Sequence, residues 1–296
     1  MAPGWNRRAA LKGLLSSAAT VGLLGGAGAH PVPAAFAPAG TDLAGRLRQS
    51  VCRWCFQDMP LEQLCAAAKE MGLRGIDLVE PADWPTLRKY GLDSPMCNGA
   101  EINLTDGFND PRFHARLQQQ YAAMIPRVAA TGYTNLICFS GSRRGLSDEA
   151  GWVNCARGLQ PLLDLAARHK VVLVMELLNA KVDHPDYQCN RTRWGVTLAQ
   201  RLGSEHFKLL YDIYHMQIDE GDVIRTITDY HPYIAHYHTA GVPGRHEPDD
   251  TQELNYPAIM RAIRATGFQG YVAQEFVPAR ADKLASLRQA VRLCDV

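Results

Sequence analysis

Short apolar runs recur from about residue 41 to the C-terminal end of the chain, and longer amphipathic stretches separate them. Runs that are apolar throughout are typical of strands buried on both faces, as in a parallel sheet. The pattern predicts eight such strands, at residues 50–55, 75–79, 96–102, 135–139, 171–177, 208–213, 234–239 and 270–276.

The stretches between the strands have the periodicity of amphipathic helices. In residues 61–71, for example, Leu61, Leu64 and Ala68 fall on one helix face. Helices are expected at residues 61–71, 111–131, 148–169, 192–202, 222–230, 257–266 and 279–293. Strands that alternate with helices predict an α/β protein with a (β/α)8 TIM barrel. The alternative, a doubly wound open sheet, would need a Gly-rich phosphate loop after the first strand, and residues 55–60 do not supply one.

Residues 1–40 have a different character from the barrel segment. Arg7 and Arg8 precede a weakly hydrophobic Ala/Gly/Leu stretch, which resembles a twin-arginine export signal. A membrane anchor is the alternative, but the apolar run is shorter than the roughly 20 residues that span a bilayer. We therefore expect two parts: residues 1–40 are a twin-arginine export signal with a flexible segment, and residues 41–296 are a single catalytic barrel. The protein is expected to be periplasmic or secreted, without stable membrane insertion of the mature chain.

Composition narrows the classes of partner. The net charge is +1 and no basic stripe is present, so nucleic acid is not an expected partner. Eight cysteines leave disulfides open for an exported protein, although most lie in apolar contexts that suit small buried side chains. Cys52 and Cys55 form a C-x-x-C pair, but on a strand they would point to opposite faces. The oligomeric state is left open.

Four polar side chains end or follow late apolar runs, and each is about one strand–helix–strand crossover from the next. They are Glu176, Asp212, His238 and Glu275. In a parallel barrel the C-terminal ends of the strands meet at one mouth. Carboxylates and one imidazole gathered there would hold a divalent cation.

Each of the four also has a structural alternative. Glu176 and Glu275 could each form an ion pair, and Asp212 could cap a following helix. A single histidine in an apolar strand is usually a hydrogen-bonded core residue, but His236 and His238 share one strand face. The presence of two histidines on this face favours a ligand with a second polar group beneath it. His238 is the expected ligand because it lies nearer the mouth, with His236 beneath it.

Further residues are expected around the substrate. Arg245 lies in a Gly/Pro-shaped loop, and its guanidinium suits a carboxylate or a polar sugar end. His215 is expected to reach the substrate from a loop after Asp212. His184 lies in a loop expected to shape the pocket. Trp54 and Trp84 could form an apolar wall, with core packing as the alternative.

These motifs together resemble the hydroxypyruvate isomerase group of the xylose-isomerase-like TIM barrels. The matching stretches are MELLN, YDIYHMQ, VPGRHEP, ELNYPAI and YVAQEF, and residues 50–56 are similar to the first strand of that group. The resemblance implies one divalent metal, Mg²⁺ or Mn²⁺, with Co²⁺ or Zn²⁺ as alternatives. It implies that Glu176 and Glu275 are metal ligands and the acid/base pair, and that Asp212 is a ligand.

One position departs from the group. Bacterial hydroxypyruvate isomerases typically have glutamine where this chain has His238, whereas the related ketose 3-epimerases have histidine in a similar H-x-H strand. The expected reaction is isomerisation of a small α-hydroxy carbonyl compound, such as hydroxypyruvate to tartronate semialdehyde, through an enediolate. The alternatives are a ketose 3-epimerase, a keto-sugar lyase or epimerase, and a noncatalytic exported sugar-binding protein. A nuclease similar to endonuclease IV is disfavoured, because the charge is near neutral and only one ligand set is present.

Overall fold

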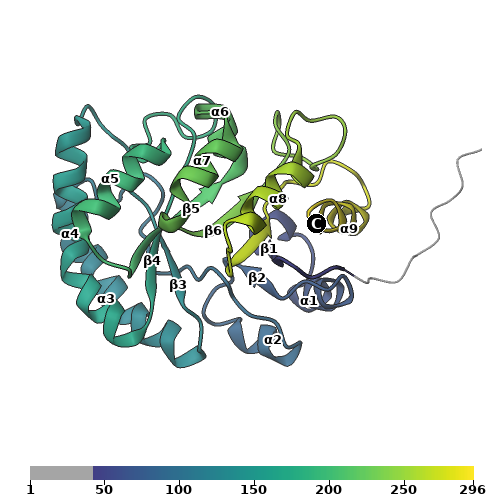
Figure 1. Ribbon diagram of the computed structural model, residues 1–296. Coiled ribbons are helices and arrows are strands. Elements are labelled where there is room, and N and C mark those ends of the chain that lie inside the picture. The colour runs from purple at the N-terminus through teal and green to yellow at the C-terminus, as the bar shows by residue number, and fades with distance from the viewer. Residues whose placement is uncertain (1–42) are drawn as a thin grey trace, which may run out of the picture. The chain divides into compact units, whose positions relative to one another are not determined.

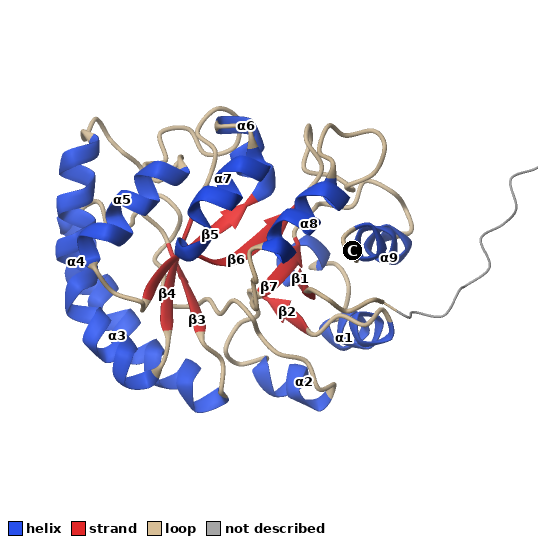
Figure 2. Cartoon of the chain, in the orientation of Figure 1, coloured by secondary structure: helices blue, strands red, loops and turns tan. Residues whose placement is uncertain are grey.

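Parallel strands form a curved sheet that an outer layer of helices surrounds (Figures 1 and 2). The structure is a computed structural model, and it describes residues 43–296. Its strands are β1 (Arg48–Cys52), β2 (Gly75–Asp77), β3 (Asn135–Cys138), β4 (Val172–Glu176), β5 (Phe207–Asp212), β6 (Ile234–Thr239) and β7 (Tyr271–Gln274). They pair in the order β2-β1-β7-β6-β5-β4-β3, and every pair is parallel. A curved, all-parallel sheet with helices outside it is the arrangement of the predicted α/β TIM-barrel class.

The prediction of a strand at 96–102 is wrong. Of residues 96–102, only Met96 and Cys97 pair with the two edge strands: Leu78 N donates to Met96 O (2.8 Å), and Ile137 N donates to Cys97 O (2.9 Å). Pro95 has no backbone N–H to extend this pairing, and Gly99 turns the chain with φ 98°. Residues 98–104 therefore form a loop where a regular barrel would continue its third strand.

The helices carry the apolar faces that cover the strands. They are α1 (Leu61–Glu70), α2 (Trp84–Lys89), α3 (His114–Thr131), α4 (Asp148–His169), α5 (Thr192–Leu202), α6 (Ile213–Asp219), α7 (Val223–Tyr230), α8 (Tyr256–Ala265) and α9 (Lys283–Leu293), with short 3-10 turns at Arg53–Phe56, Pro111–Phe113 and His231–Tyr233. The Ser147 side chain accepts from Ala150 N and fixes the start of α4. Two helices, α2 and α6, were not predicted.

The eight cysteines are buried and free, so the structure contains no disulfide between them. The first strand ends at Cys52, and Cys55 lies in the following 3-10 turn rather than on the predicted continuous strand. Burial raises the pKa of the Cys52 thiol well above its ordinary value, which keeps the sulfur protonated. Most cysteines thus serve as small core side chains, as their apolar contexts predict.

The predicted export signal at residues 1–40 lies outside the described residues and stays a prediction. Within residues 43–296, no helix combines the length and the apolar character needed to cross a bilayer.

Candidate metal centre and substrate pocket

The four predicted ligand residues come together at the C-terminal ends of the strands. They are Glu176 at the end of β4, Asp212 at the end of β5, His238 in β6, and Glu275 directly after β7. One potential ligand atom from each lies within 4.8 Å of the other three. All four side chains are buried. Three carboxylates at this separation in a buried place repel one another unless positive charge lies among them.

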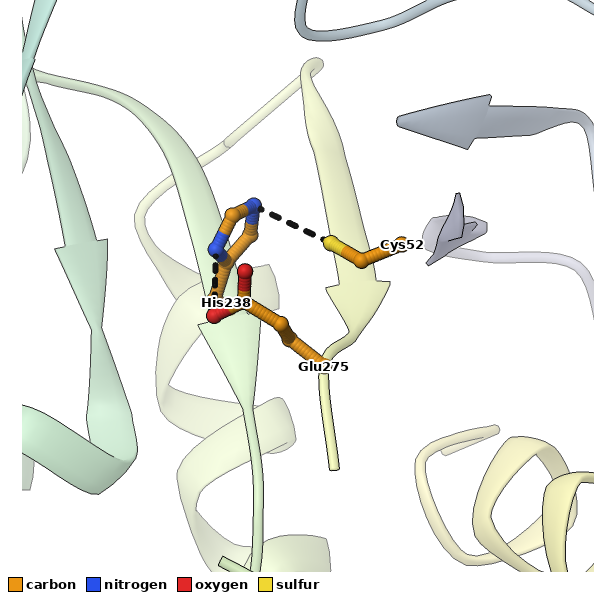
Figure 3. Close-up of side chains that lie close together, drawn as sticks. All are labelled: Cys52, His238 and Glu275. Atoms are coloured by element: carbon orange, nitrogen blue, oxygen red, sulfur yellow. Dashed lines mark hydrogen bonds and ion pairs between the residues drawn. The ribbon is translucent and has the colours of Figure 1, made fainter. Parts of the chain in front are cut away.

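His238 presents its two ring nitrogens to different groups. Its Nδ1 lies 3.0 Å from Glu275 Oε2 and 3.4 Å from Glu176 Oε1. Its Nε2 lies 3.7 Å from the sulfur of Cys52, so the ring stands between β1 and the residue that follows β7 (Figure 3). The Nδ1 edge is therefore the one directed at the carboxylate cluster.

A buried carboxylate on β2 holds the opposite edge of this ring. Asp77 Oδ2 lies 2.5 Å from His236 Nε2 and 3.6 Å from His238 Nε2, and all three side chains are fully buried. Carboxylates in this position fix the tautomer and orientation of metal-binding histidines. The polar group expected beneath His238 was His236, whereas Asp77, which contacts both imidazoles, was missed. The available signal was a lone aspartate in the apolar run at 75–79.

Asp212 has both of the roles that its sequence position offers. Its Oδ1 accepts from Tyr214 N (2.8 Å) and His215 N (3.2 Å), which caps α6. Its Oδ2 faces the cluster, 3.4 Å from the guanidinium of Arg245. Strand β5 thus passes directly into helix α6, and this junction fixes the direction in which the Asp212 carboxylate points.

Arg245 lies among the carboxylates. A guanidinium nitrogen lies 2.6 Å from Glu275 Oε2, and the group packs over the rings of Trp54 (5.0 Å) and Tyr214 (5.2 Å). Trp54 Nε1 also donates to Glu275 Oε1 at 2.8 Å. Both oxygens of Glu275 are therefore held in place, and Trp54 is a polar as well as an apolar neighbour of the site.

His215 lies on α6 and not in a loop, which corrects the sequence interpretation. Its side chain is fully buried, with Nδ1 2.6 Å from Asn179 Nδ2 and Nε2 3.6 Å from Asp212 Oδ2. The ring of His184 packs on it at 5.2 Å and lines the pocket. Trp84 is a core residue that packs edge-on against Tyr133, away from these groups.

Burial and mutual repulsion shape the pKa values of the cluster. Burial raises the pKa of Glu176, and it raises the pKa of Asp212 well above its ordinary value, with Glu275 adding to both shifts. Burial acts in the same direction on Glu275, but His238 and Arg245 outweigh it and hold that pKa well below its ordinary value. Much of the negative charge thus resides on Glu275, beside the two cationic groups.

The residues present fit a divalent cation. Glu176 Oε1 and His238 Nδ1 are buried, have no hydrogen-bond partner among the described residues, and face the centre of the cluster. An unpaired buried polar atom is costly, and a divalent cation that displaces the proton of the ring nitrogen would bind both atoms at once. Oxygen donors with one imidazole suit Mg²⁺ or Mn²⁺, and they also allow Zn²⁺ or Co²⁺.

A pocket of about 560 Å³ leads to this cluster. Glu176, Glu275 and Arg245 form one part of its lining, together with Trp54 and His184. Its other part consists of Leu78, Glu80, Asn98, Glu101, Ile102, Asn103 and Leu104, from the loops after β2 and around the missing strand. None of this second group was predicted: Asn98, Glu101 and Ile102 fell in the segment interpreted as a buried strand, and Leu78 fell in the predicted strand at 75–79.

Replacing Asp77 with asparagine tests its role in holding His238. The change keeps the side-chain size but removes the charge that faces the two imidazoles. We expect the affinity for Mn²⁺, measured by titration calorimetry, to fall about ten- to a hundredfold. Cys52→Ser, which alters the neutral neighbour of the same ring nitrogen, should change affinity far less. A lower melting temperature with unchanged Mn²⁺ affinity would instead make Asp77 a purely structural residue.

Comparisons with known proteins identify the family of this fold. A family model described as a xylose isomerase-like TIM barrel matches residues 65–294. The chain belongs to this family. A putative hydroxypyruvate isomerase from Homo sapiens is 26% identical over 79% of this chain and 80% of its own length. The hydroxypyruvate isomerase of Escherichia coli K12 is 28% identical over 71% of this chain and 85% of its own length. The resemblance drawn from the motifs is confirmed.

Solved structures with the same fold include proteins that are named for different activities. A family 2 AP endonuclease from Brucella melitensis aligns with TM-score 0.73 and 24% identity, covering 81% of this chain and 97% of its own. The 3-keto-D-glucoside 4-epimerase of E. coli aligns with TM-score 0.70 and 20% identity over 84% of this chain and 100% of its own. The IolI protein, crystallised with a zinc atom, aligns with TM-score 0.66 and 14% identity over 84% of this chain and 95% of its own. At these identities the likeness shows the fold alone.

Proposed function

We propose that this protein is a metal-dependent isomerase of a small α-hydroxy carbonyl compound, similar in reaction to hydroxypyruvate isomerase. The convergence of Glu176, Asp212, His238 and Glu275 at the barrel mouth carries the proposal. The names of the two relatives support an isomerase as the enzyme class. The pocket beside the cluster gives a substrate access to both glutamates.

The two glutamates are placed to move a proton. Glu176 and Glu275 come from β4 and from the end of β7, and two strands lie between them. One glutamate takes the proton from the carbon beside the substrate carbonyl. The other delivers a proton to the neighbouring carbon for isomerisation, or to the opposite face of the same carbon for epimerisation. A divalent cation held by the four residues would act as a Lewis acid that polarises the carbonyl.

The hydrogen bonds around the two carboxylates differ. Glu275 accepts from Trp54 and Arg245, so both of its oxygens are fixed before the substrate arrives. Glu176 Oε1 has no hydrogen-bond partner among the described residues and can take or give a proton. Asn179 donates toward His215, which holds that imidazole against Asp212 and supports the remaining ligand.

Epimerisation of a keto-sugar is the second candidate, and it uses the same groups. His238 favours it, because the related ketose 3-epimerases have histidine at this position. In epimerisation the proton returns to the same carbon and the carbonyl stays in place. In isomerisation the proton goes to the former carbonyl carbon, and the hydroxyl proton passes to the former carbonyl oxygen. Both reactions depend on the same pair of bases at carbon.

Deuterium exchange at carbon tests the proposal. The purified protein is incubated with Mn²⁺ in D₂O with hydroxypyruvate, ketohexoses or keto-sugars, and NMR follows deuterium entering the substrate. We expect exchange that requires the metal and stops with a chelator. If no compound exchanges while some of them bind, the barrel is a sugar-binding protein and not an isomerase.

A further inference from the structure

A second group of potential ligands lies beneath the candidate metal centre, inside the barrel. It consists of Asp77 on β2 with His236 and His238 on β6, and one donor atom from each lies within 4.8 Å of the other two. The three side chains are fully buried. His238 belongs to both groups, because its Nδ1 edge faces the mouth and its Nε2 edge faces Asp77. Donor atoms therefore lie against both edges of one imidazole.

The polar atoms of this interior group lack ordinary partners. Within residues 43–296, the ion pairs of Asp77 are with the two imidazoles alone. Neither oxygen of Asp77 and neither ring nitrogen of His236 has a hydrogen-bond partner there, because the 2.5 Å contact between Asp77 Oδ2 and His236 Nε2 is not aligned as a hydrogen bond. Unpaired polar atoms at full burial are costly, and a cation bound between these two groups would lower that cost.

Cys52 brings a sulfur atom to the same edge of His238. Strands β1 and β2 are parallel neighbours in which Cys52 lies opposite Asp77. The sulfur of Cys52 is 3.7 Å from His238 Nε2, and Asp77 Oδ2 is 3.6 Å from the same nitrogen. Donor atoms at the corners of a zinc tetrahedron are about 3.3–3.6 Å apart, given bonds of about 2.0–2.3 Å. These two distances suit zinc, and the contact between Asp77 and His236 would lengthen by about 0.8 Å on binding.

The types of donor distinguish the interior group from the one at the mouth. The mouth offers three carboxylates and one imidazole, which suit Mg²⁺ or Mn²⁺. The interior offers two imidazoles, one carboxylate and one thiol, and this set is typical of zinc and poor for hard cations. Burial adds to the distinction, because Mg²⁺ usually keeps several waters that it would have to lose among fully buried side chains.

A chain of donor atoms leads from the substrate pocket to the interior group. Cys52, His238 and Glu275 also have one donor atom each within 4.8 Å of the other two (Figure 3). Glu275 lines the pocket, whereas Cys52 is fully buried at the end of β1. A cation can thus pass from the carboxylate of Glu275 to the sulfur of Cys52 with a donor atom beside it throughout.

We infer that a second cation site, selective for Zn²⁺ over Mg²⁺ and Mn²⁺, lies beneath the metal centre at the mouth. Its donors are Asp77, His236, Cys52 and Nε2 of His238. Zinc displaces the thiol proton and the proton on Nε2, and both protons go to solvent. When both sites are filled, His238 bridges the two ions through its two ring nitrogens. The site does not depend on the proposed isomerase function, because it binds its ion without substrate.

Metal content tests the inference in the purified full chain. The protein is stripped of metal with a chelator, loaded with excess Zn²⁺ or Mn²⁺, desalted, and measured by inductively coupled plasma mass spectrometry. We expect two zinc ions per chain but one manganese ion. His236→Gln should reduce the zinc content to one ion and leave the manganese content unchanged. The matched control is His231→Gln, the same change at an exposed histidine in the turn before β6, and it should retain two zinc ions.

Cobalt spectroscopy gives a second readout that does not require the His236 variant to fold. Co²⁺ replaces zinc, and its coordination by Cys52 produces a sulfur-to-cobalt charge-transfer band in the near ultraviolet. We expect this band in the wild-type protein at full cobalt loading, and its loss in Cys52→Ser.

Two results would overturn the inference. One zinc ion per chain, or the absence of the sulfur band, would make the interior group a part of the core that only orients His238. Two zinc ions that persist in both His236→Gln and Cys52→Ser would place the second ion elsewhere on the protein. Carbon–deuterium exchange is measured separately with Mn²⁺, so the isomerase proposal stands or falls independently of these results.

Discussion

Replacing Glu275 with glutamine should abolish carbon–proton exchange, with a loss of about a thousandfold or more. The amide has nearly the same shape, and its oxygen still accepts the hydrogen bond from Trp54 Nε1. It can neither take a proton from carbon nor balance the guanidinium of Arg245. Glu176→Gln should have an effect of similar size, because each glutamate performs one of the two proton transfers.

Metal binding must be separated from proton transfer in these variants. The Mn²⁺ affinity of each variant is measured by calorimetry, and exchange is then assayed at saturating metal. If exchange returns to the wild-type rate once metal saturates, the glutamate is only a ligand. Retained exchange in either variant would reject the assignment of two bases, while Glu62→Gln, the same change at an exposed residue outside the pocket lining, provides a fold control.

Replacing Asp212 with asparagine should remove most of the metal affinity while leaving the fold intact. Asparagine caps helices about as well as aspartate, so Tyr214 N and His215 N keep their acceptor and α6 keeps its start. The anionic ligand is lost, however, and we expect Mn²⁺ affinity to fall by at least about a hundredfold, measured by calorimetry. Asp212→Ala should lose the metal and also lower the free energy of unfolding by about 1 kcal/mol through the missing cap.

The comparison of the two substitutions separates the two roles of one side chain. Chemical denaturation of the metal-free proteins should place the asparagine variant close to wild type and the alanine variant below it. If the asparagine variant binds Mn²⁺ as tightly as wild type, Asp212 serves the helix and the metal centre lacks the ligand assigned to it.

Helices and strands of the barrel could be predicted from sequence where the hydrophobic pattern of the segment itself determines the element. The expected helices at 148–169 and 192–202 and the expected strand at 234–239 have the same bounds as α4, α5 and β6. The pattern failed where two elements share residues. Because Asp212 ends β5 and caps α6, the apolar run continues without a break, and α6 could not be separated from its strand.

The candidate site could be predicted to the extent that its residues end apolar strands. Glu176, Asp212, His238 and Glu275 meet that condition, and they converge. Asp77 lies on β2 and reaches His236 and His238 of β6 across the barrel interior, a contact that no local spacing encodes. Glu101 was missed for a different reason: the apolar residues near it favoured a strand, and the end of the pairing after Cys97 cannot be read from sequence.

Because the third strand is incomplete, part of the pocket wall is a loop whose residues can change without breaking the sheet. The candidate metal ligands lie on, or directly after, strands whose hydrogen bonds close the barrel. Residues 98–104 carry little of that closure, which rests on Met96 and Cys97. Insertions and exchanges in this short loop should alter which substrates the pocket accepts more than they alter the metal centre, so it is the natural segment to randomise when a new specificity is wanted.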